Sequence, residues 1–165
     1  AQGTRRKLPR GSSDASLTPI HVDRSKLFVL QRFGDISLLD AGRIARAIEC
    51  TRFPSPQIIA SSDEEGALLR AADLIGQLGD PHYLRKANAL YWEFEEVGIN
   101  RQLNYTSPAD LVDKYPPFYF SQVAPHVQQA LRYLSITARG RQWVANLYSN
   151  VFRSEQKLHH YGPVI

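Results

Sequence analysis

Three polar side chains in the middle of the chain have the types and the spacing that a binding or catalytic site needs. Arg70, Asp73 and Gln77 follow one another at intervals of three and four residues within SSDEEGALLRAADLIGQLGDPHY, residues 61–83. On a helix, residues at this spacing are neighbours on one face. A carboxylate can bind a metal ion, an amide can hold a water molecule, and a guanidinium can neutralise an anion. The spacing therefore predicts a helix that presents one chemically competent stripe.

Two interpretations of this stripe stay open. In the first, it is an ordinary solvated face that carries an Arg–Asp pair. In the second, a mostly buried helix turns it toward a polar cavity, because Leu69 and Leu74 flank it and leave a polar arc of only about 140°. We prefer the cavity. We expect Asp73 to be buried there and to be paired or to bind a metal, since burying a lone charge is costly.

The helix that must position the stripe has its own start and stop signals. Ser61 and Ser62 are candidate N-caps, and three acidic residues follow them in the first turn, at the positive end of the helix dipole. Pro81 ends the helix, because the residue before a proline is pushed out of the helical region. The apolar face consists of Leu68, Ala71, Ala72, Ile75 and Leu78.

A second group of candidate residues is cationic. His21, Arg24 and Lys26 lie on the polar side of the helix expected over HVDRSKLFVLQRF, residues 21–33, which Thr18 or Asp23 could cap. A histidine and two cations close together suit an anionic ligand. A cationic surface patch is the alternative interpretation.

Arg52 is a further cation at an unusual position. The helix expected over residues 38–50 breaks at TRFPSP, residues 51–56, because two prolines prevent its continuation. Such breaks often position functional side chains. We therefore single out Arg52 as a candidate functional side chain.

The rest of the chain predicts more helices. They are expected over residues 82–98, from Ser107, over residues 122–134 and over residues 138–157. Gly98 should end the first of them, Ser107 and Thr137 should cap later ones, and residues 100–105 should form a loop. Residues 115–120 read as a proline-broken aromatic connector that packs in the core. The acidic Glu93, Glu95 and Glu96 lack a histidine at ligand spacing and read as a solvated turn.

No alternating strand pattern and no internal repeat interrupt this pattern. The fold class is therefore all-α, an irregular bundle of about six or seven helices. The length of 165 residues suits one domain with a sizeable core. We expect residues 1–16 to form a flexible basic arm and residues 17–165 to form the helical domain.

The charge distribution supports that division. The net charge is +4, and four cations lie in the first eleven residues without an acidic partner: Arg5, Arg6, Lys7 and Arg10. Such an arm can bind nucleic acid or phosphate, although a disordered tail is the default. Without the arm the charges balance, so a body that binds nucleic acid is not indicated.

Cysteine usage and hydropathy bear on location. The single cysteine, Cys50, excludes an internal disulfide framework and fits a reducing compartment. No apolar run reaches the length of a membrane span, and no signal peptide opens the chain. These features predict a cytoplasmic protein without a membrane partner. Methionine is absent, even at position 1, so we expect the chain to be processed or to be part of a longer protein.

Three strings carry a resemblance to a known family. ALLRAADLIGQLGDPHYLRK, RIARAIECTRFP and ALYWEFEEVG, residues 67–86, 43–54 and 89–98, resemble the HD-domain metal-dependent phosphohydrolases. The branch related in layout to cyclic-nucleotide phosphodiesterases is the most similar. The resemblance covers about residues 17–152. It implies a helical fold and one or two divalent cations, Mg, Mn, Fe or Zn, bound by a histidine, a histidine–aspartate doublet and a last aspartate.

The resemblance also implies roles for individual residues. The last aspartate of the pattern falls on Asp73, and His21 lies where phosphodiesterase-like members carry an additional pocket histidine. Gln77 and Arg52 become the candidate catalytic residues, the first holding a water molecule or the substrate and the second facing phosphate. The candidate substrate-binding residues are His21, Arg24 and Lys26. None of the five histidines is followed by aspartate, so the resemblance is to the C-terminal portion of the family only.

The implied function is metal-dependent hydrolysis of a phosphoester, with nucleotides and cyclic nucleotides among the candidates. A non-catalytic helical interaction or regulatory module is the alternative, and nucleic-acid binding through the arm ranks last. One aspartate cannot hold a catalytic metal. We therefore expect the chain alone to be inactive, and to be stable only with a missing N-terminal half or with a second copy.

Overall fold

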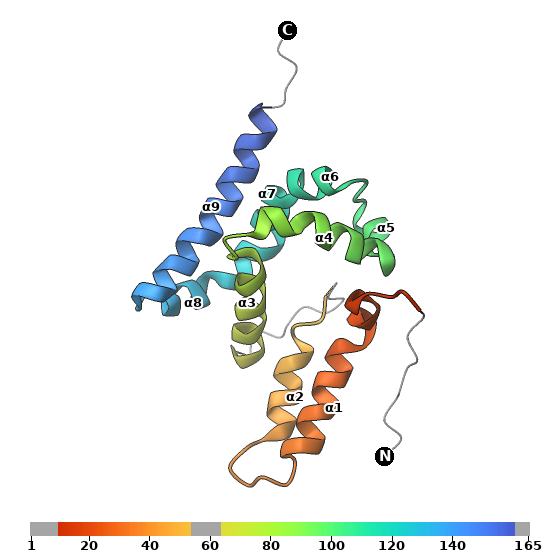
Figure 1. The fold of residues 1–165 in the computed structure, drawn as a ribbon. Helices are drawn as coiled ribbons and strands as arrows, with labels where there is room; N and C mark the ends of the chain where they lie inside the picture. Colours follow the sequence, from red (N-terminus) through yellow and green to blue (C-terminus); the bar gives the residue numbers. More distant parts are fainter. Residues whose placement is uncertain (1–9, 54–63, 161–165) are drawn as a thin grey trace.

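A computed structural model describes residues 10–53 and 64–160, and Figure 1 shows their arrangement. Within these two ranges the chain is helical and contains no β-strand, so the predicted all-α class is confirmed. None of the helices described is both long enough and apolar enough to cross a membrane.

The helices follow one another in a fixed order along the chain. Their bounds are η1 Asp14–Ile20, a 3-10 helix, then α1 His21–Phe33, α2 Ala41–Glu49, α3 Glu64–Leu78, α4 Tyr83–Glu96, α5 Ile99–Leu103, α6 Pro108–Asp113, α7 Tyr115–Phe118, η2 Tyr119–Val123, a π-helical segment, α8 Ala124–Leu134 and α9 Ala138–His160.

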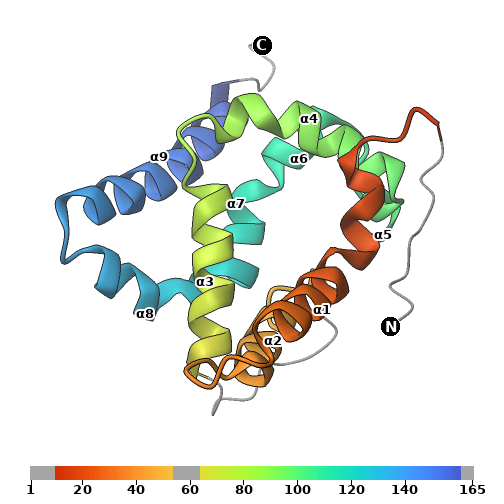
Figure 2. The ribbon, with the colours of Figure 1, turned by 60° about the horizontal axis from the view of Figure 1, so that its bottom comes forward.

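Helix α3 occupies the middle of the molecule (Figures 1 and 2). The antiparallel pair α1 and α2 packs against it on one side, and α8 and α9 pack on the other. Helices α4 to α7 lie beyond its C-terminal end. The helix that carries the polar stripe is therefore the element that joins the two sides.

The main hydrophobic core lies between α3, the start of α4, α7, η2, α8 and α9. Five of its members recur every four residues along one continuous helical run: Tyr115, Tyr119, Val123, Val127 and Leu131, each at most 6% exposed. Tyr115 and Tyr119 of the aromatic segment thus pack in the core as predicted, whereas Phe120 is 58% exposed. A smaller cluster joins α4 to α6.

The prediction that prolines break the helix at residues 115–120 is wrong, because these prolines fall at positions where a helix tolerates them. Pro116 and Pro117 stand in the first turn of α7, where no amide hydrogen is needed. Pro125 lacks the amide that would bond to the Ser121 carbonyl, and the Ala124 amide instead donates to the Tyr119 carbonyl five residues back. The chain therefore continues through a π-helical turn.

Helix α9 fixes the C-terminal end of α3. The Asn150 side-chain amide donates to the carbonyl oxygens of Leu78 and Asp80, each at 2.8 Å. Gly79 comes directly after α3 and lies against α9, where a Cβ would be 3.1 Å from Cε3 of Trp143. These contacts explain why the LGDP sequence stands at this point: it closes α3 against a neighbouring helix.

Several predicted helix ends are confirmed. The Ser107 hydroxyl accepts a hydrogen bond from the Asp110 amide at 3.0 Å, with proline at the first helical position. The Thr137 hydroxyl likewise accepts from the Gly140 amide at 2.9 Å. Gly98 has a φ of +77°, the left-handed conformation expected of a C′ glycine.

The loop expected over residues 100–105 is wrong over most of its length, since α5 occupies Ile99–Leu103. Two left-handed residues, Gly98 and Asn104, bracket this short helix. Asn100 is 1% exposed, and its side-chain amide donates to the Tyr91 carbonyl at 3.0 Å. Burial of Asn100 against α4 therefore stabilises a turn of helix that local propensity does not reveal.

The N-terminal boundary also differs from the prediction. The 3-10 helix η1 begins at Asp14, and the Ser13 hydroxyl donates to Glu96 on α4 at 2.6 Å. The ordered domain thus begins before residue 17. Residues 1–9 of the arm, and the proposed caps Ser61 and Ser62, lie outside the described residues.

Two smaller predictions are wrong. Neither Thr18 nor Asp23 caps α1, because η1 leads directly into it and Ile20 stands at the N-cap without a side-chain bond. The apolar pattern of residues 138–157 also predicts that Phe152 faces inward, but it is 60% exposed. The second discrepancy arises because Phe152 lies on the outer face of α9, while Val151 and Ser154 on either side of it are at most 5% exposed.

Candidate functional site

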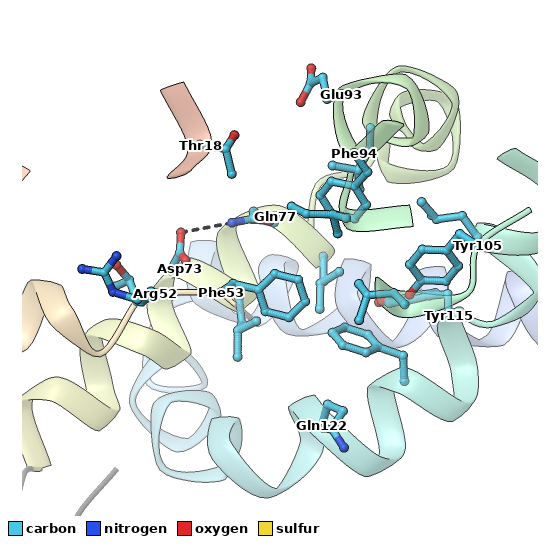
Figure 3. A pocket seen from close by; sticks show the side chains of 18 of the residues that line it. Thr18, Arg52, Phe53, Asp73, Gln77, Glu93, Phe94, Tyr105, Tyr115 and Gln122 are labelled. Carbon is cyan, nitrogen blue, oxygen red and sulfur yellow. Dashed lines mark hydrogen bonds between the residues drawn. The ribbon is translucent and has the colours of Figure 1, made fainter. Parts of the chain in front are cut away.

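A cavity of about 540 Å³ lies where η1, α1 and the end of α2 meet the middle of the molecule. Helices α3 to α7 complete its wall, and Figure 3 shows side chains from these elements around it. A volume of this size lies within the range of small-molecule sites. The cavity has two ends of different character.

The polar end carries the predicted stripe. Arg70, Asp73 and Gln77 all line the cavity, and the Gln77 amide donates to Asp73 Oδ1 at 3.2 Å (Figure 3). The predicted cavity is therefore present. The predicted burial is wrong, because Asp73 is exposed to solvent. Helix α2 meets α3 near its start, where Arg43 pairs with Glu65, and so leaves the middle of α3 uncovered.

Arg52 lines the same end, but acidic neighbours already bind its guanidinium. Its Nη2 lies 2.7 Å from Asp23 Oδ1, and its Nε lies 2.5 Å from Glu49 Oε1. Lys26 pairs with the other oxygen of Glu49 at 2.7 Å and is not part of the cavity wall. Arg52 first, and then Lys26, lower the pKa of Glu49 to about 2. The four side chains form an ion cluster that joins α1 to the end of α2.

The other two predicted substrate-binding residues are placed differently. His21 lines the cavity, and its Nδ1 lies 2.6 Å from the Thr18 carbonyl oxygen. A carbonyl only accepts, so Nδ1 carries the hydrogen and Nε2 is the acceptor of the neutral ring. Arg24 is exposed and is not part of the wall. Of the three residues proposed to bind substrate, the structure brings only His21 to the cavity.

Arg70 also acts on the neighbouring helix α8. Burial, and then the positive charge of Arg70, lower the pKa of His126. The Arg70 guanidinium therefore lies close enough to α8 to repel the protonated His126 ring, and Arg70 also lines the cavity. His126 was not singled out in the sequence, because nothing local connects it to α3.

The opposite end is aromatic. Tyr105 and Tyr115 lie there together, with the ring of Phe53 between them and Asp73 in the view of Figure 3. Tyr83 also lines the cavity, and its ring centroid is 4.6 Å from that of Tyr115. Phe118 completes an edge-to-face pair with Phe53 at 6.3 Å. These side chains come from α4, α7 and separate loops, so no spacing in the sequence predicts that they meet.

The described residues do not by themselves form a metal site. They contain no group of three or more His, Cys, Asp and Glu side chains arranged to hold a cation. Two acidic residues of α4 have structural partners: Glu95 accepts from Asn100 at 2.9 Å, and Glu96 accepts from Ser13. At the polar end, Asp73 is the carboxylate that stands beside an amide and a guanidinium on the wall.

We compared the chain with models of protein families, with curated proteins and with solved structures. The model of a family described as Npun_R2479-like matches residues 1–157. No curated protein and no solved structure matches the chain.

Proposed function

The chain belongs to the Npun_R2479-like family, and for this member we propose metal-dependent hydrolysis of a phosphoester, of the HD type. The chain would supply Asp73 as one metal ligand and the surrounding cavity as the substrate site. The observation that carries the proposal is the Asp73–Gln77 pair, exposed at the polar end of a cavity of ligand size.

The residues around that pair suit the chemistry. A bound divalent metal would activate water and polarise a phosphoryl oxygen. Gln77, held against Asp73, can orient a water molecule or a phosphate oxygen through its amide. Arg70 lies one turn before Asp73 on the same wall, and its charge opposes that of a phosphate. The aromatic end would accept the organic part of the ester.

The rest of the metal cage would come from a partner. The described residues offer Asp73 without two further His, Cys, Asp or Glu ligands. We therefore propose that an N-terminal half of a longer polypeptide, or a second copy of the chain, brings the remaining ligands to the exposed face of Asp73. On this proposal the chain alone is inactive.

A non-catalytic regulatory module is the second candidate. The observation that favours it is the ion cluster: Glu49 and Asp23 already neutralise Arg52, which leaves less positive charge for a transferred phosphoryl group. Such a module would bind a ligand in the cavity without turnover.

Hydrolysis of bis(4-nitrophenyl) phosphate with Mn²⁺ or Mg²⁺ separates the two candidates. The full-length polypeptide should turn over this probe. Asp73→Asn should reduce the rate by about 100-fold or more, because the metal would contribute several kcal/mol to the stabilisation of the transition state. Glu93→Gln is the matched control, because Glu93 lines the cavity but lies away from Asp73 in Figure 3. An Asp73→Asn variant that retains metal binding and full turnover would exclude the proposed role. Ligand binding without turnover in the parent protein would favour the regulatory module.

A further inference from the structure

The hydroxyl group of Tyr115 stands out at the aromatic end of the cavity. The side chain is 2% exposed, and its hydroxyl has no hydrogen-bond partner among the described residues. Buried polar groups in folded proteins are nearly always paired, because an unmade hydrogen bond is not compensated by water. The residue also lines the cavity. A group that enters this end can therefore supply the missing partner.

Two further tyrosines define the surroundings of that hydroxyl. Tyr83 stacks at an angle against Tyr115, and Tyr105 lies beside it (Figure 3). We call these three residues the tyrosine end. Burial raises the pKa of each phenol above its ordinary value, so the hydroxyls stay protonated at neutral pH and can donate. The cations of the wall, Arg52 and Arg70, belong to the polar end (Figure 3 labels the first).

We propose that the tyrosine end is a subsite for an uncharged, largely apolar group that carries one hydrogen-bond acceptor, such as a carbonyl oxygen or a ring nitrogen. The acceptor takes the hydroxyl hydrogen of Tyr115, and the apolar part packs on the rings. A charged group is disfavoured here because burial would remove it from water. A cation, Lys114, lies 5.8 Å over the Tyr105 ring, but Asp110 already pairs with it at 2.9 Å. The inference deepens the proposed function in one respect: the phosphate of the same ligand would lie at the polar end.

Tyr119 also has a buried hydroxyl without a hydrogen-bond partner among the described residues, so the place of Tyr115 on the cavity wall is what distinguishes it. Tyr119, four residues later, is 1% exposed and packs in the same core, but it is not part of the cavity wall. The two tyrosines therefore form a matched pair on one helical run. Removing the hydroxyl should change ligand preference at position 115 and should leave it unchanged at position 119.

The test compares two probes that differ only in the acceptor: 4-acetylphenyl phosphate and 4-isopropylphenyl phosphate, which have the same number of heavy atoms. Binding is measured by calorimetry in the presence of a chelator, so that no turnover occurs. The unsubstituted protein should bind the acetyl probe about 5-fold more tightly than the isopropyl probe, which is the usual contribution of one neutral hydrogen bond. Tyr115→Phe should abolish this preference while keeping the affinity for the isopropyl probe, and Tyr119→Phe should retain it.

The neutral pair acetophenone and isopropylbenzene distinguishes failure of this inference from failure of the proposed function. A preference for acetophenone that Tyr115→Phe removes, without binding of either phosphate, would uphold the tyrosine end and reject the phosphoester. Equal binding of both members of each pair, a preference that survives Tyr115→Phe, or no binding of any probe would overturn the inference. If Tyr115→Phe does not fold, the parent with ¹³C-labelled tyrosine serves instead. The Tyr115 Cζ signal should then shift with acetophenone and not with isopropylbenzene, and an unchanged signal would reject the subsite.

Discussion

Asn150 on α9 donates its side-chain amide to the carbonyl oxygen of Leu78 at the end of α3, across 2.8 Å and 72 positions of sequence. Asn150 is 2% exposed. Its second hydrogen bond, to the Asp80 carbonyl, closes the turn that follows. Because Gln77 directly precedes Leu78, this contact helps to set where the polar stripe of α3 stops.

Replacing Asn150 should destabilise the fold. Asn150→Ala leaves two carbonyl groups at the end of α3 without their side-chain donor, and we expect a loss of about 2 kcal/mol in the free energy of unfolding. Urea denaturation measures it. Asn146→Ala is the control on the same helix, because Asn146 accepts a hydrogen bond from the exposed Gln142, and its loss should change stability by less than about 0.5 kcal/mol. Equal effects of the two substitutions would contradict the assigned role.

Two glycines of the LIGQLG sequence should respond oppositely to alanine. At Gly79 a Cβ would lie 2.8 Å from the Ile75 carbonyl oxygen and 3.1 Å from Trp143, so Gly79→Ala should destabilise by about 1–3 kcal/mol. At Gly76 nothing lies within 4 Å of the added carbon, and Gly76→Ala should stabilise α3 by up to about 1 kcal/mol. Thermal unfolding of both variants tests the pair, and a destabilising Gly76→Ala would show that α3 packs differently.

The ion cluster predicts an acid-dependent loss of stability. Arg52 and Lys26 hold the pKa of Glu49 at about 2, below its ordinary value of 4.5. The folded state therefore favours the carboxylate, and its stabilisation is complete above about pH 4.5 and is lost as the pH falls toward about 2. Glu49→Gln should remove this part of the pH dependence. Urea unfolding of both proteins across that range measures it, and parallel curves would contradict the cluster.

The position of Arg70 can be tested through His126. Burial and the charge of Arg70 both lower the pKa of this imidazole. Arg70→Gln removes the charge but not the burial, so the pKa of His126 should rise without fully returning to its ordinary value. NMR titration of the histidine ring reports the change directly. No change in the titration of His126 would place Arg70 away from α8.

The sequence predicted what depends on neighbours within one helix. The stripe of Arg70, Asp73 and Gln77 needs only the helical period, and it lies together on the cavity wall. The exposure of Asp73 was not predicted, because it depends on where α2 meets α3 rather than on the leucines that flank the stripe.

The aromatic end of the cavity could not be predicted from the sequence for a related reason. Tyr83 and Tyr105 belong to different elements, and only the folded chain brings them to Tyr115. The short helix α5 was read as a loop because its stability rests on a buried asparagine, Asn100, which is a weak helix former in isolation. The helical period predicts which residues share one face of a helix. A cavity also depends on how far apart the faces of different helices lie, which the period does not predict.

The π-helical segment η2 keeps two distant parts of one helical run in rotational register. Sixteen residues separate Tyr115 from Leu131, and in a regular α-helix they would overshoot four whole turns by about 160°. The wider turn at Tyr119–Val123 takes up part of that excess, so both side chains stay on the buried side. Deleting one residue from this turn would do more than shorten the helix, because it would rotate the cavity wall at Tyr115 relative to the core beneath α8. Chain length within η2 is therefore constrained by the site, even though Ser121 within it is exposed.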